Sequence, residues 1–178
     1  MKETDWFYEA VKYAYKQGLM EGTAADTFAP LATTSRGMMV TLLWRLAGEP
    51  QVDYAMTFGD VESGSWYTEA VRWAASEQIV GGYSDTMFAP GDAITREQLA
   101  AILYRYAEYA QRDTSARGDL SGYTDGAQVS SWARDAVEWA AGTGLLTGKG
   151  AGVLDPGGTA TRAEVATMLM RFVTAADK

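Results

Sequence analysis

The sequence predicts a mainly α fold made of three helix–loop–helix repeats. A hexapeptide that begins with Trp occurs three times, at residues 6–11, 66–71 and 132–137. Other residue types recur at fixed distances from each Trp, namely a Gly (Gly22, Gly82, Gly148), a Pro (Pro30, Pro90, Pro156) and two Arg (Arg36, Arg96, Arg162 and Arg45, Arg105, Arg171). Apolar residues near both ends of each repeat have helical spacing. Repetition at a nearly constant period is stronger evidence for the architecture than the local helix propensity of any segment.

The chain has 178 residues, and we divide it into repeats at 1–50, 51–111 and 112–178. A unit of this size without disulfides buries little surface when it folds alone. We therefore expect the three repeats to form one structural unit. The segment Phe58-Gly59-Asp60-Val61 before the second Trp has no counterpart before the first, so repeat 1 is expected to be truncated at its N-terminus.

In repeat 1, the first helix is predicted to run from Trp6 to Gly18. Its apolar side chains share one face, and Gly18 suits the left-handed conformation that ends a helix. A loop with a short extended piece follows and ends at Pro30. Ser35 is expected to cap the second helix, which ends at Gly48.

In repeats 2 and 3, the first helices are predicted at 66–76 and 132–141 and the second helices at 95–110 and 161–173. Ser65 is a candidate cap. Gln78 stands where the other repeats have Gly, so that helix end is expected to differ. The second helices are the more apolar, and we expect them to form a central three-helix bundle with pseudo-threefold symmetry. The first helices and the loops then lie outside it.

The composition excludes several kinds of function. The sequence has no Cys and no His, which removes thiol chemistry, the common zinc sites and the usual general base. A net charge of −8 argues against nucleic acid as a partner. No apolar run is long enough for membrane insertion. The sequence predicts no cofactor, no metal site and no catalytic residue.

Each second helix opens with a similar tetrapeptide: Ser35-Arg36-Gly37-Met38, Thr95-Arg96-Glu97-Gln98 and Thr161-Arg162-Ala163-Glu164. In the last two, Thr and the Gln or Glu three residues later form a capping box. The Arg is not explained by capping, because a cation in the first turn meets the positive end of the helix dipole at a cost of about 0.3–1 kcal/mol. Its partner is either a carboxylate of a neighbouring repeat, such as Asp60 or Asp125, or an external anion. The free N–H groups of a helix start and a planar guanidinium suit a carboxylate or phosphate.

The spaced residues of repeat 2 resemble the S-layer homology (SLH) repeat: Phe58–Val61, Trp66-Tyr67, Ala70-Val71, Gly82, Phe88–Pro90 and Thr95–Glu97. Three tandem copies are the usual set in this family. The resemblance implies a non-catalytic module in which three prongs surround a central helical bundle. It also implies that grooves between the repeats bind secondary cell-wall polymer of Gram-positive bacteria through a pyruvate-ketal sugar.

By position, the resemblance assigns the main anion contact to Arg36, Arg96 and Arg162. Repeat 1 lacks the capping-box acid and has a Gly beside its Arg. We therefore expect its groove to be degenerate or differently selective, and we expect loss of Arg36 to weaken polymer binding less than loss of Arg96 or Arg162. The resemblance also places Asp60 and Asp125 at the grooves. Asp125 lies one residue further from its Trp than Asp60 does, so its side chain could point elsewhere.

The first Trp of each repeat has two interpretations. Trp6, Trp66 and Trp132 could stack on a sugar, but an aromatic residue that starts an apolar helical stripe favours a place in the core. A position at the edge of a groove would satisfy both.

The repeated Gly residues of the loops (Gly22, Gly82 and Gly148) are predicted to supply positive φ angles and, secondarily, room for a ligand. Lys149 follows the last of them and could assist an anion there. The second Arg of each repeat lies late in its helix, where a cation suits the dipole, and is interpreted as structural.

Two other classes of function compete with wall binding. A glycoside hydrolase needs two carboxylates facing one cleft, and no carboxylate pair recurs in all three repeats. A protein–protein interaction scaffold would expose an aromatic or Met patch instead of an Arg-centred groove. The favoured interpretation is part of a larger secreted protein, at the cell surface, with its signal peptide outside this sequence.

Overall fold

The computed structural model describes residues 1–24 and 26–175, and these form six α-helices. They are α1 (Tyr8–Lys16), α2 (Arg36–Leu46), α3 (Thr68–Ser76), α4 (Arg96–Tyr109), α5 (Arg134–Gly142) and α6 (Arg162–Ala175). Two short 3₁₀ segments, Gly126–Gln128 and Ser131–Ala133, precede α5. The β structure of these residues consists of isolated bridges. The predicted mainly α class is confirmed.

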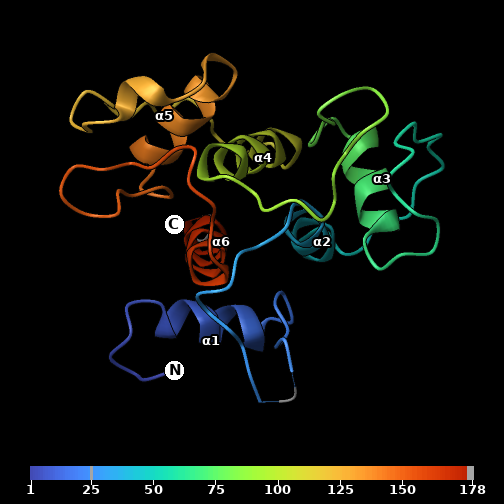
Figure 1. The fold of residues 1–178 in the computed structure, drawn as a ribbon, viewed down its shortest axis with the longest axis horizontal. Helices are drawn as coiled ribbons and strands as arrows, with labels where there is room; N and C mark the ends of the chain where they lie inside the picture. The colour runs from blue at the N-terminus through green and yellow to red at the C-terminus, as the bar shows by residue number, and fades with distance from the viewer. Residues whose placement is uncertain (25, 176–178) are drawn as a thin grey trace.

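The second helix of each repeat lies towards the middle of the molecule and the first helix lies outside. Figure 1 shows α2, α4 and α6 around the centre, with α1, α3 and α5 beyond them. Buried apolar side chains come from both sets, for example Leu43, Leu99 and Leu169 from the inner helices and Val71 and Val137 from the outer ones. The predicted division into inner and outer helices is therefore present.

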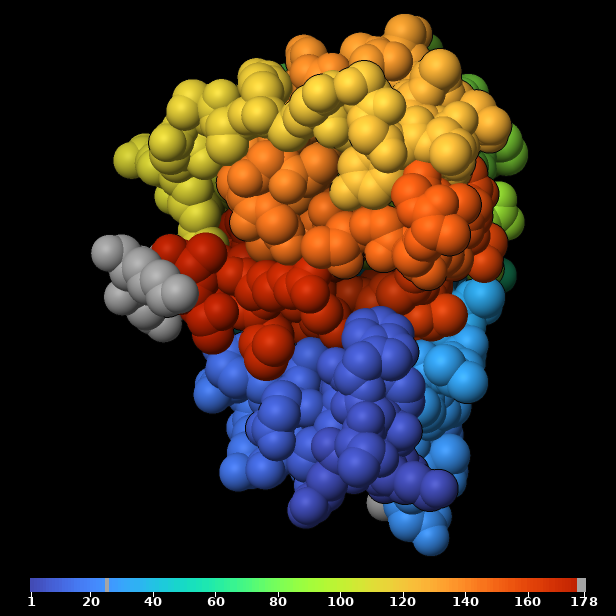
Figure 2. All heavy atoms as spheres, turned by 90° about the vertical axis from the view of Figure 1, so that its left-hand side faces the viewer, coloured from blue at the N-terminus to red at the C-terminus, as the bar shows by residue number. Residues whose placement is uncertain are grey.

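Each outer helix packs against an inner helix of a different repeat. α3 contacts α2, α5 contacts α4, and α1 contacts α6. The last pair closes the arrangement, because it brings the first helix of the chain against the last. Figure 2 shows the N-terminal segment in blue directly beside the red C-terminal helix. The helical pairs of the structure therefore each combine two repeats.

A cyclic set of backbone hydrogen bonds joins the three repeats just before the inner helices. Thr34 N donates to Ala160 O, Ile94 N donates to Thr34 O, and Ala160 N donates to Ile94 O, each at 2.9 Å. Every repeat thus donates one bond and accepts one. This closed ring gives the molecule its pseudo-threefold character.

The predicted caps of the inner helices are confirmed. Ser35 Oγ accepts from Met38 N at 3.2 Å, and Thr95 forms a complete capping box with Gln98. Thr161 and Glu164 exchange the same bonds. Ser65 is not a cap, because α3 begins at Thr68 after Tyr67 and has no side-chain cap.

The ends of the outer helices are alike in all three repeats. Gly18 and Gly144 have φ values of 67° and 71°, and Gln78 has φ 58°. The expectation that the helix end at Gln78 differs is wrong, since Gln78 adopts the left-handed conformation that Gly adopts more readily.

Candidate functional site: three grooves between the repeats

Three cavities of about 540, 400 and 430 Å³ occupy equivalent places in the pseudo-threefold structure. Volumes of this size suit small ligands. Each cavity is lined by the first Arg of one repeat, by the loop and inner helix of the next, and by the Trp of the third.

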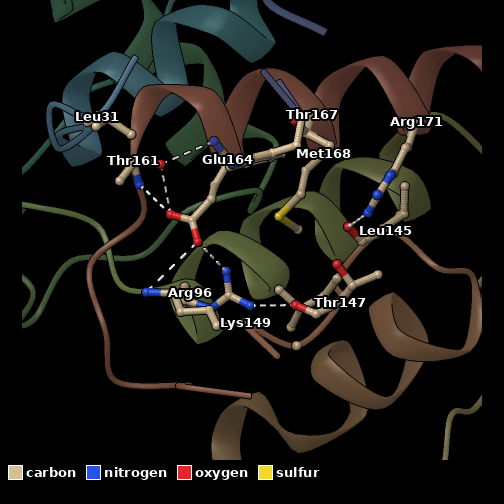
Figure 3. A pocket seen from close by; sticks show the side chains of 13 residues that line it. Leu31, Arg96, Leu145, Thr147, Lys149, Thr161, Glu164, Thr167, Met168 and Arg171 are labelled. Atoms are coloured by element: carbon tan, nitrogen blue, oxygen red, sulfur yellow. Dashed lines mark hydrogen bonds and ion pairs between the residues drawn. The ribbon is translucent and has the colours of Figure 1, made fainter. Parts of the chain in front are cut away.

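We name the grooves by that Arg. The Arg36 groove is lined by Arg36, Gly82, Tyr83, Gln98, Arg105 and Trp132, among others. The Arg96 groove, shown in Figure 3, is lined by Arg96, Gly148, Lys149, Glu164, Arg171 and Trp6. The Arg162 groove is lined by Arg162, Gly22, Thr23, Met38, Arg45 and Trp66.

The three helix-start Arg residues are 4–7% exposed and are held by backbone carbonyls of the next repeat. Their Nε atoms donate to Phe88 O, Leu154 O and Phe28 O at 2.9–3.0 Å. Their Nη2 atoms donate to Gly81 O, Thr147 O and Glu21 O at 2.5–3.0 Å. These carbonyls compensate the unfavourable dipole position, so the shared internal partner is neither Asp60 nor Asp125.

The first N–H groups of the inner helices are also used inside the protein. Arg36 N donates to Asp92 O and Gly37 N to Pro90 O, both at 2.9 Å. The corresponding groups of α4 and α6 donate in the same way to the loops of repeats 3 and 1. The expectation that a ligand anion meets free helix-start N–H groups is therefore wrong. The guanidinium groups remain as the cationic lining.

Asp60 and Asp125 hold the loops instead of lining the grooves. Asp60 accepts from Phe88 N and Ala89 N at 2.9 and 2.6 Å, and Asp125 accepts from Leu154 N and Asp155 N at 2.8 and 2.7 Å. Asp125 makes the same pair of bonds as Asp60 despite its extra residue. Each aspartate therefore holds in place the loop residue whose carbonyl accepts the hydrogen bond from an Arg Nε atom.

The pKa of each aspartate is lowered by these contacts. For Asp60, burial works against ionisation, but the bonds from Phe88 and Ala89 and the charge of Arg36 outweigh it and lower the pKa. For Asp125, the bond from Leu154 is the main cause of the lowered pKa, and Arg96 contributes its charge. Burial lowers the pKa of Arg36 and of Arg162, which still leaves a guanidinium charged near neutral pH.

The three Trp side chains form the outer edges of the grooves. Trp6, Trp66 and Trp132 are 65%, 59% and 56% exposed. The expectation that they belong to the core is wrong, because the outer helices begin two residues later and their N-terminal turns leave the indoles outside. The buried core aromatics include Trp73 and Trp139, the second Trp of repeats 2 and 3.

The repeated Gly residues line the grooves, but not through positive φ angles. Neither Gly22 nor Gly82 nor Gly148 has one. A Cβ at Gly82 would overlap Met87 O, Ser84 O and a carbon of Phe58, and a Cβ at Gly148 would lie 2.7 Å from Val153 O. Close backbone approach within the loop is therefore the reason for Gly.

Comparison with known protein families identifies the repeats. The S-layer homology domain model matches residues 1–37, 57–100 and 122–166. The chain belongs to the S-layer homology domain family. The SLH resemblance drawn from the repeat motif is therefore confirmed.

Relatives of this SLH chain include larger proteins of bacteria. It is 31% identical to the surface-layer 125 kDa protein of Lysinibacillus sphaericus, over 95% of the chain and 14% of that protein. It is also 31% identical to an endoglucanase of Bacillus sp. (strain KSM-635), over 95% of the chain and 18% of the relative. A cellulosome-anchoring protein of Acetivibrio thermocellus is 22% identical over 85% of the chain and 34% of its own length. The chain thus spans less than a fifth of the first two relatives.

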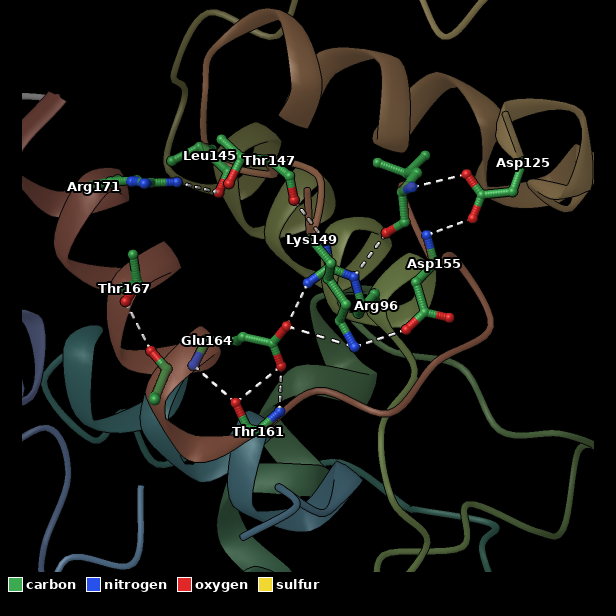
Figure 4. A network of polar contacts seen from close by, with 12 residues as sticks. Arg96, Asp125, Leu145, Thr147, Lys149, Asp155, Thr161, Glu164, Thr167 and Arg171 are labelled. Carbon is green, nitrogen blue, oxygen red and sulfur yellow. Dashed lines mark hydrogen bonds and ion pairs between the residues drawn. The ribbon is translucent and has the colours of Figure 1, made fainter. Parts of the chain in front are cut away.

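The grooves of this SLH chain differ in their charges. In the Arg96 groove, Arg96 Nη1 lies 2.7 Å from Glu164 Oε1, and Lys149 Nζ lies 2.7 Å from Asp155 Oδ2 (Figure 4). In the Arg162 groove, Arg45 lies 3.6 Å from Glu21. No carboxylate lines the Arg36 groove among the residues with described positions. There the guanidinium makes cation–π contacts with the rings of Tyr83 and Phe88, with Cζ 4.6 Å from each centroid.

The sequence reasoning missed the second Arg of each repeat. Arg45, Arg105 and Arg171 line the Arg162, Arg36 and Arg96 grooves. Nine residues separate the two Arg of an inner helix, which is about two and a half turns. The two side chains therefore leave opposite faces and enter different grooves. Their constant spacing in all three repeats was the signal that could have identified them.

The capping box of a repeat does not serve the groove of its own Arg. Gln98 of repeat 2 faces Arg36, Glu164 of repeat 3 faces Arg96, and Met38 of repeat 1 lines the groove of Arg162. The missing capping-box acid of repeat 1 therefore affects the Arg162 groove. The expectation that this missing acid makes the Arg36 groove the weakest binding site is wrong in its geometric reason.

Proposed function

We propose that this chain is a non-catalytic module that anchors a larger extracellular protein to the cell wall. Its ligand is an anionic secondary cell-wall polysaccharide that carries pyruvate ketals, bound in the grooves between repeats. The proposed site is at the cell surface and uses no cofactor. The partner is the wall polymer, with no nucleic acid and no membrane insertion.

One observation carries the proposal: three equivalent grooves each combine a buried guanidinium with an exposed indole. A guanidinium binds a carboxylate through charge-assisted hydrogen bonds. An indole offers an apolar face on which a sugar ring can lie. Carboxylate and sugar ring are the two parts of a pyruvylated saccharide. Threefold repetition of the pair also suits a repetitive polymer, because several weak sites add avidity.

The net charge of −8 disfavours long-range attraction to an anionic polymer. That repulsion is screened over about 8 Å at physiological ionic strength. Recognition therefore depends on the local cations of each groove. The pairs Arg36 with Arg105 and Arg162 with Arg45 supply that local charge.

The relatives that are named as glycoside hydrolases fit the same proposal. The chain covers 18% of the endoglucanase and 9% of an amylopullulanase of Thermoanaerobacterium thermosulfurigenes. We assign to this chain the attachment of such a protein and not its hydrolysis step. A scaffold for protein partners is less well supported, because the exposed Trp side chains lie in three separate grooves instead of one patch. No helix in the described parts of the chain has the length and apolar character needed to cross a membrane.

Sedimentation with purified cell walls tests the proposal. The Trp6→Ala/Trp66→Ala/Trp132→Ala variant should fold, because the three indoles are more than half exposed, and should lose most wall binding. Removal of the ketals from the walls should have the same effect on the unmodified chain. Arg72→Ala is a control, because Arg72 pairs with Glu69 on α3 away from the grooves. Undiminished binding after both changes would contradict the proposal.

A further inference from the structure

The three grooves differ in the group that faces the remaining edge of the guanidinium. In each Arg, Nε and Nη2 are bound to loop carbonyls, so Nη1 is the nitrogen left for a ligand. In the Arg96 groove, Nη1 donates to Glu164 Oε1 at 2.7 Å. The Nη1 atoms of Arg36 and Arg162 make no hydrogen bond with any part of the chain that the structure describes.

We infer that Glu164 occupies, from within the protein, the position on Arg96 that a ligand carboxylate would take, and that the Arg36 groove is therefore a stronger anion site than the Arg96 groove. This inference rests on the proposed function. It assigns unequal roles to three grooves that the repeat pattern makes look equivalent.

Glu164 cannot easily leave this position. Its second oxygen, Oε2, accepts from Thr161 N at 2.8 Å and from Thr161 Oγ1 at 2.9 Å, as Figure 4 shows. The side chain is only 14% exposed. A ligand carboxylate that displaced it would leave a largely buried anion without its cation, which is strongly unfavourable. The carboxylate of the capping box therefore competes with the ligand at close range.

Lys149, another of the three cations of the Arg96 groove, is also paired with carboxylates. Lys149 Nζ lies 2.7 Å from Asp155 Oδ2 and 3.9 Å from Glu164 Oε1. In the Arg36 groove, neither Arg36 nor Arg105 forms an ion pair with a residue of described position. The amide of Gln98 stands where Glu164 stands, and its Nε2 donates to Tyr83 Oη at 3.3 Å. Arg171, the third cation of the Arg96 groove, donates to the carbonyls of Gly144 and Leu145 and forms no ion pair with a residue of described position. Two of the three cations in the Arg96 groove are thus paired with carboxylates, whereas neither cation of the Arg36 groove is.

The edge of the Arg36 groove is also fixed more firmly. Glu97 accepts from Ser130 N and Ser130 Oγ, both at 2.9 Å. These bonds hold the segment that carries Trp132 against the start of α4. The corresponding residues are Gly37 and Ala163, which have no side-chain acceptor. A rim that is already ordered loses less conformational entropy when a ligand binds.

The indole N–H signals of ¹⁵N-labelled protein test this inference, because each groove has its own exposed Trp. The probes are a methyl hexopyranoside that carries a 4,6-pyruvate ketal and, separately, pyruvate itself. We expect the Trp132 signal to respond at about tenfold lower probe concentration than the Trp6 signal. Tenfold corresponds to about 1.4 kcal/mol, roughly the contribution of one hydrogen bond to a charged group.

Two reciprocal variants give the decisive comparison. Glu164→Gln should tighten probe binding at Trp6 about tenfold, and Gln98→Glu should weaken it at Trp132 by a similar factor. Both changes keep the capping box, since Gln98 and Glu164 each complete one already. Glu69→Gln removes a half-exposed acid of α3 and controls for the change in net charge.

An unchanged or weaker response at Trp6 in Glu164→Gln would overturn the inference, because Glu164 would then be a bystander or a ligand contact. A persisting Trp132 response to the ketal sugar would leave the proposed function intact in that case. Absence of any response to the ketal sugar would instead remove the proposed function. In that event the titration with pyruvate alone tests the inference. An equal Trp6 response to pyruvate in Glu164→Gln and in the unmodified chain would overturn the inference too.

Discussion

The Arg36 and Arg96 grooves share a backbone design and differ in the side chains that face a ligand. In both, a buried Arg donates to two loop carbonyls, and an aspartate fixes the loop. In the Arg96 groove, Glu164 then completes the coordination of the guanidinium. In the Arg36 groove, Nη1 of the Arg makes no hydrogen bond with any described part of the chain, and Arg36 lines the cavity. The shared contacts assemble the repeats, and in our proposal the remaining edge decides whether an anion binds.

Each proposed site is built from several repeats and not from one. Each groove takes its Arg, its capping-box residue and its Trp from three different repeats. One inner helix sends its first Arg into one groove and its second Arg into another. A substitution within one repeat therefore changes more than one groove.

The largest expected effect concerns the loops that line the two grooves. Gly82→Ala should lower the free energy of unfolding by about 3 kcal/mol, the upper range for forcing an atom into a packed site. The new Cβ would overlap two carbonyl oxygens and Phe58. Gly148→Ala should cost less, because its added Cβ would meet one carbonyl oxygen instead of two and would lie farther from it, at 2.7 Å from Val153 O. Urea unfolding measures both.

Gly81→Ala is the matched control for these glycines, because no atom lies within 4 Å of its added Cβ. Equal stability of Gly81→Ala and Gly82→Ala would show that close approach is not the reason for Gly at position 82.

The second prediction separates binding from stability at the two Arg residues. Arg36→Ala should weaken binding of the ketal sugar by about 2 kcal/mol, within the range for truncating one partner of a buried charged contact. Arg96→Ala should weaken total binding less, but it should destabilise the fold more, because it leaves Glu164 without its cation. Calorimetric titration and urea unfolding of each folded variant give the two quantities.

If Arg96→Ala instead reduced sugar affinity more than Arg36→Ala did, the proposed ranking of the grooves would be reversed.

The third prediction compares the caps of two inner helices. Thr95→Ala should lower stability by about 1 kcal/mol, because it removes the acceptor for Gln98 N from a complete capping box. Ser35→Ala should cost less, since Ser35 makes a single cap bond and repeat 1 has Met38 in place of the reciprocal residue. Thermal unfolding of both variants measures the difference. Identical losses would mean that the reciprocal bond adds nothing.

The smallest expected effect is on acid stability. The folded-state pKa of Asp60 is below its ordinary value, which is about 3.9 in an unfolded chain. Its contribution is therefore complete above roughly pH 4 and is lost as the pH falls through the lowered folded pKa. Asp60→Asn should be less stable than the unmodified chain at pH 7 and should lose less stability on acidification.

Asp125→Asn is the counterpart in the Arg96 groove and should behave similarly, because Asp125 makes the same two backbone bonds. Urea midpoints measured from pH 7 to pH 2 provide the test. Parallel acid profiles for both variants and the unmodified chain would exclude these aspartates as the source of the pH dependence.

The sequence by itself determined the repeat architecture, the presence of two helices in each repeat and the caps of the inner helices. Spacing within one helix fixes which side chains share a face, and Ser35, Thr95 and Thr161 carry their cap chemistry locally. The recurrence of Arg36, Arg96 and Arg162 at a helix start correctly indicated a position that needs a partner.

Only the tertiary structure decided which residues meet. Because α1 packs on α6 and each outer helix joins a different repeat, Glu164 faces Arg96 and not the Arg beside it in the chain. The same cross-repeat packing supplies the carbonyls that hold the guanidinium groups and places Trp6, Trp66 and Trp132 at the rims. A repeat period fixes the order of the elements along the chain. The identity of their neighbours depends on how the ring closes, and that follows from burial of apolar faces between repeats.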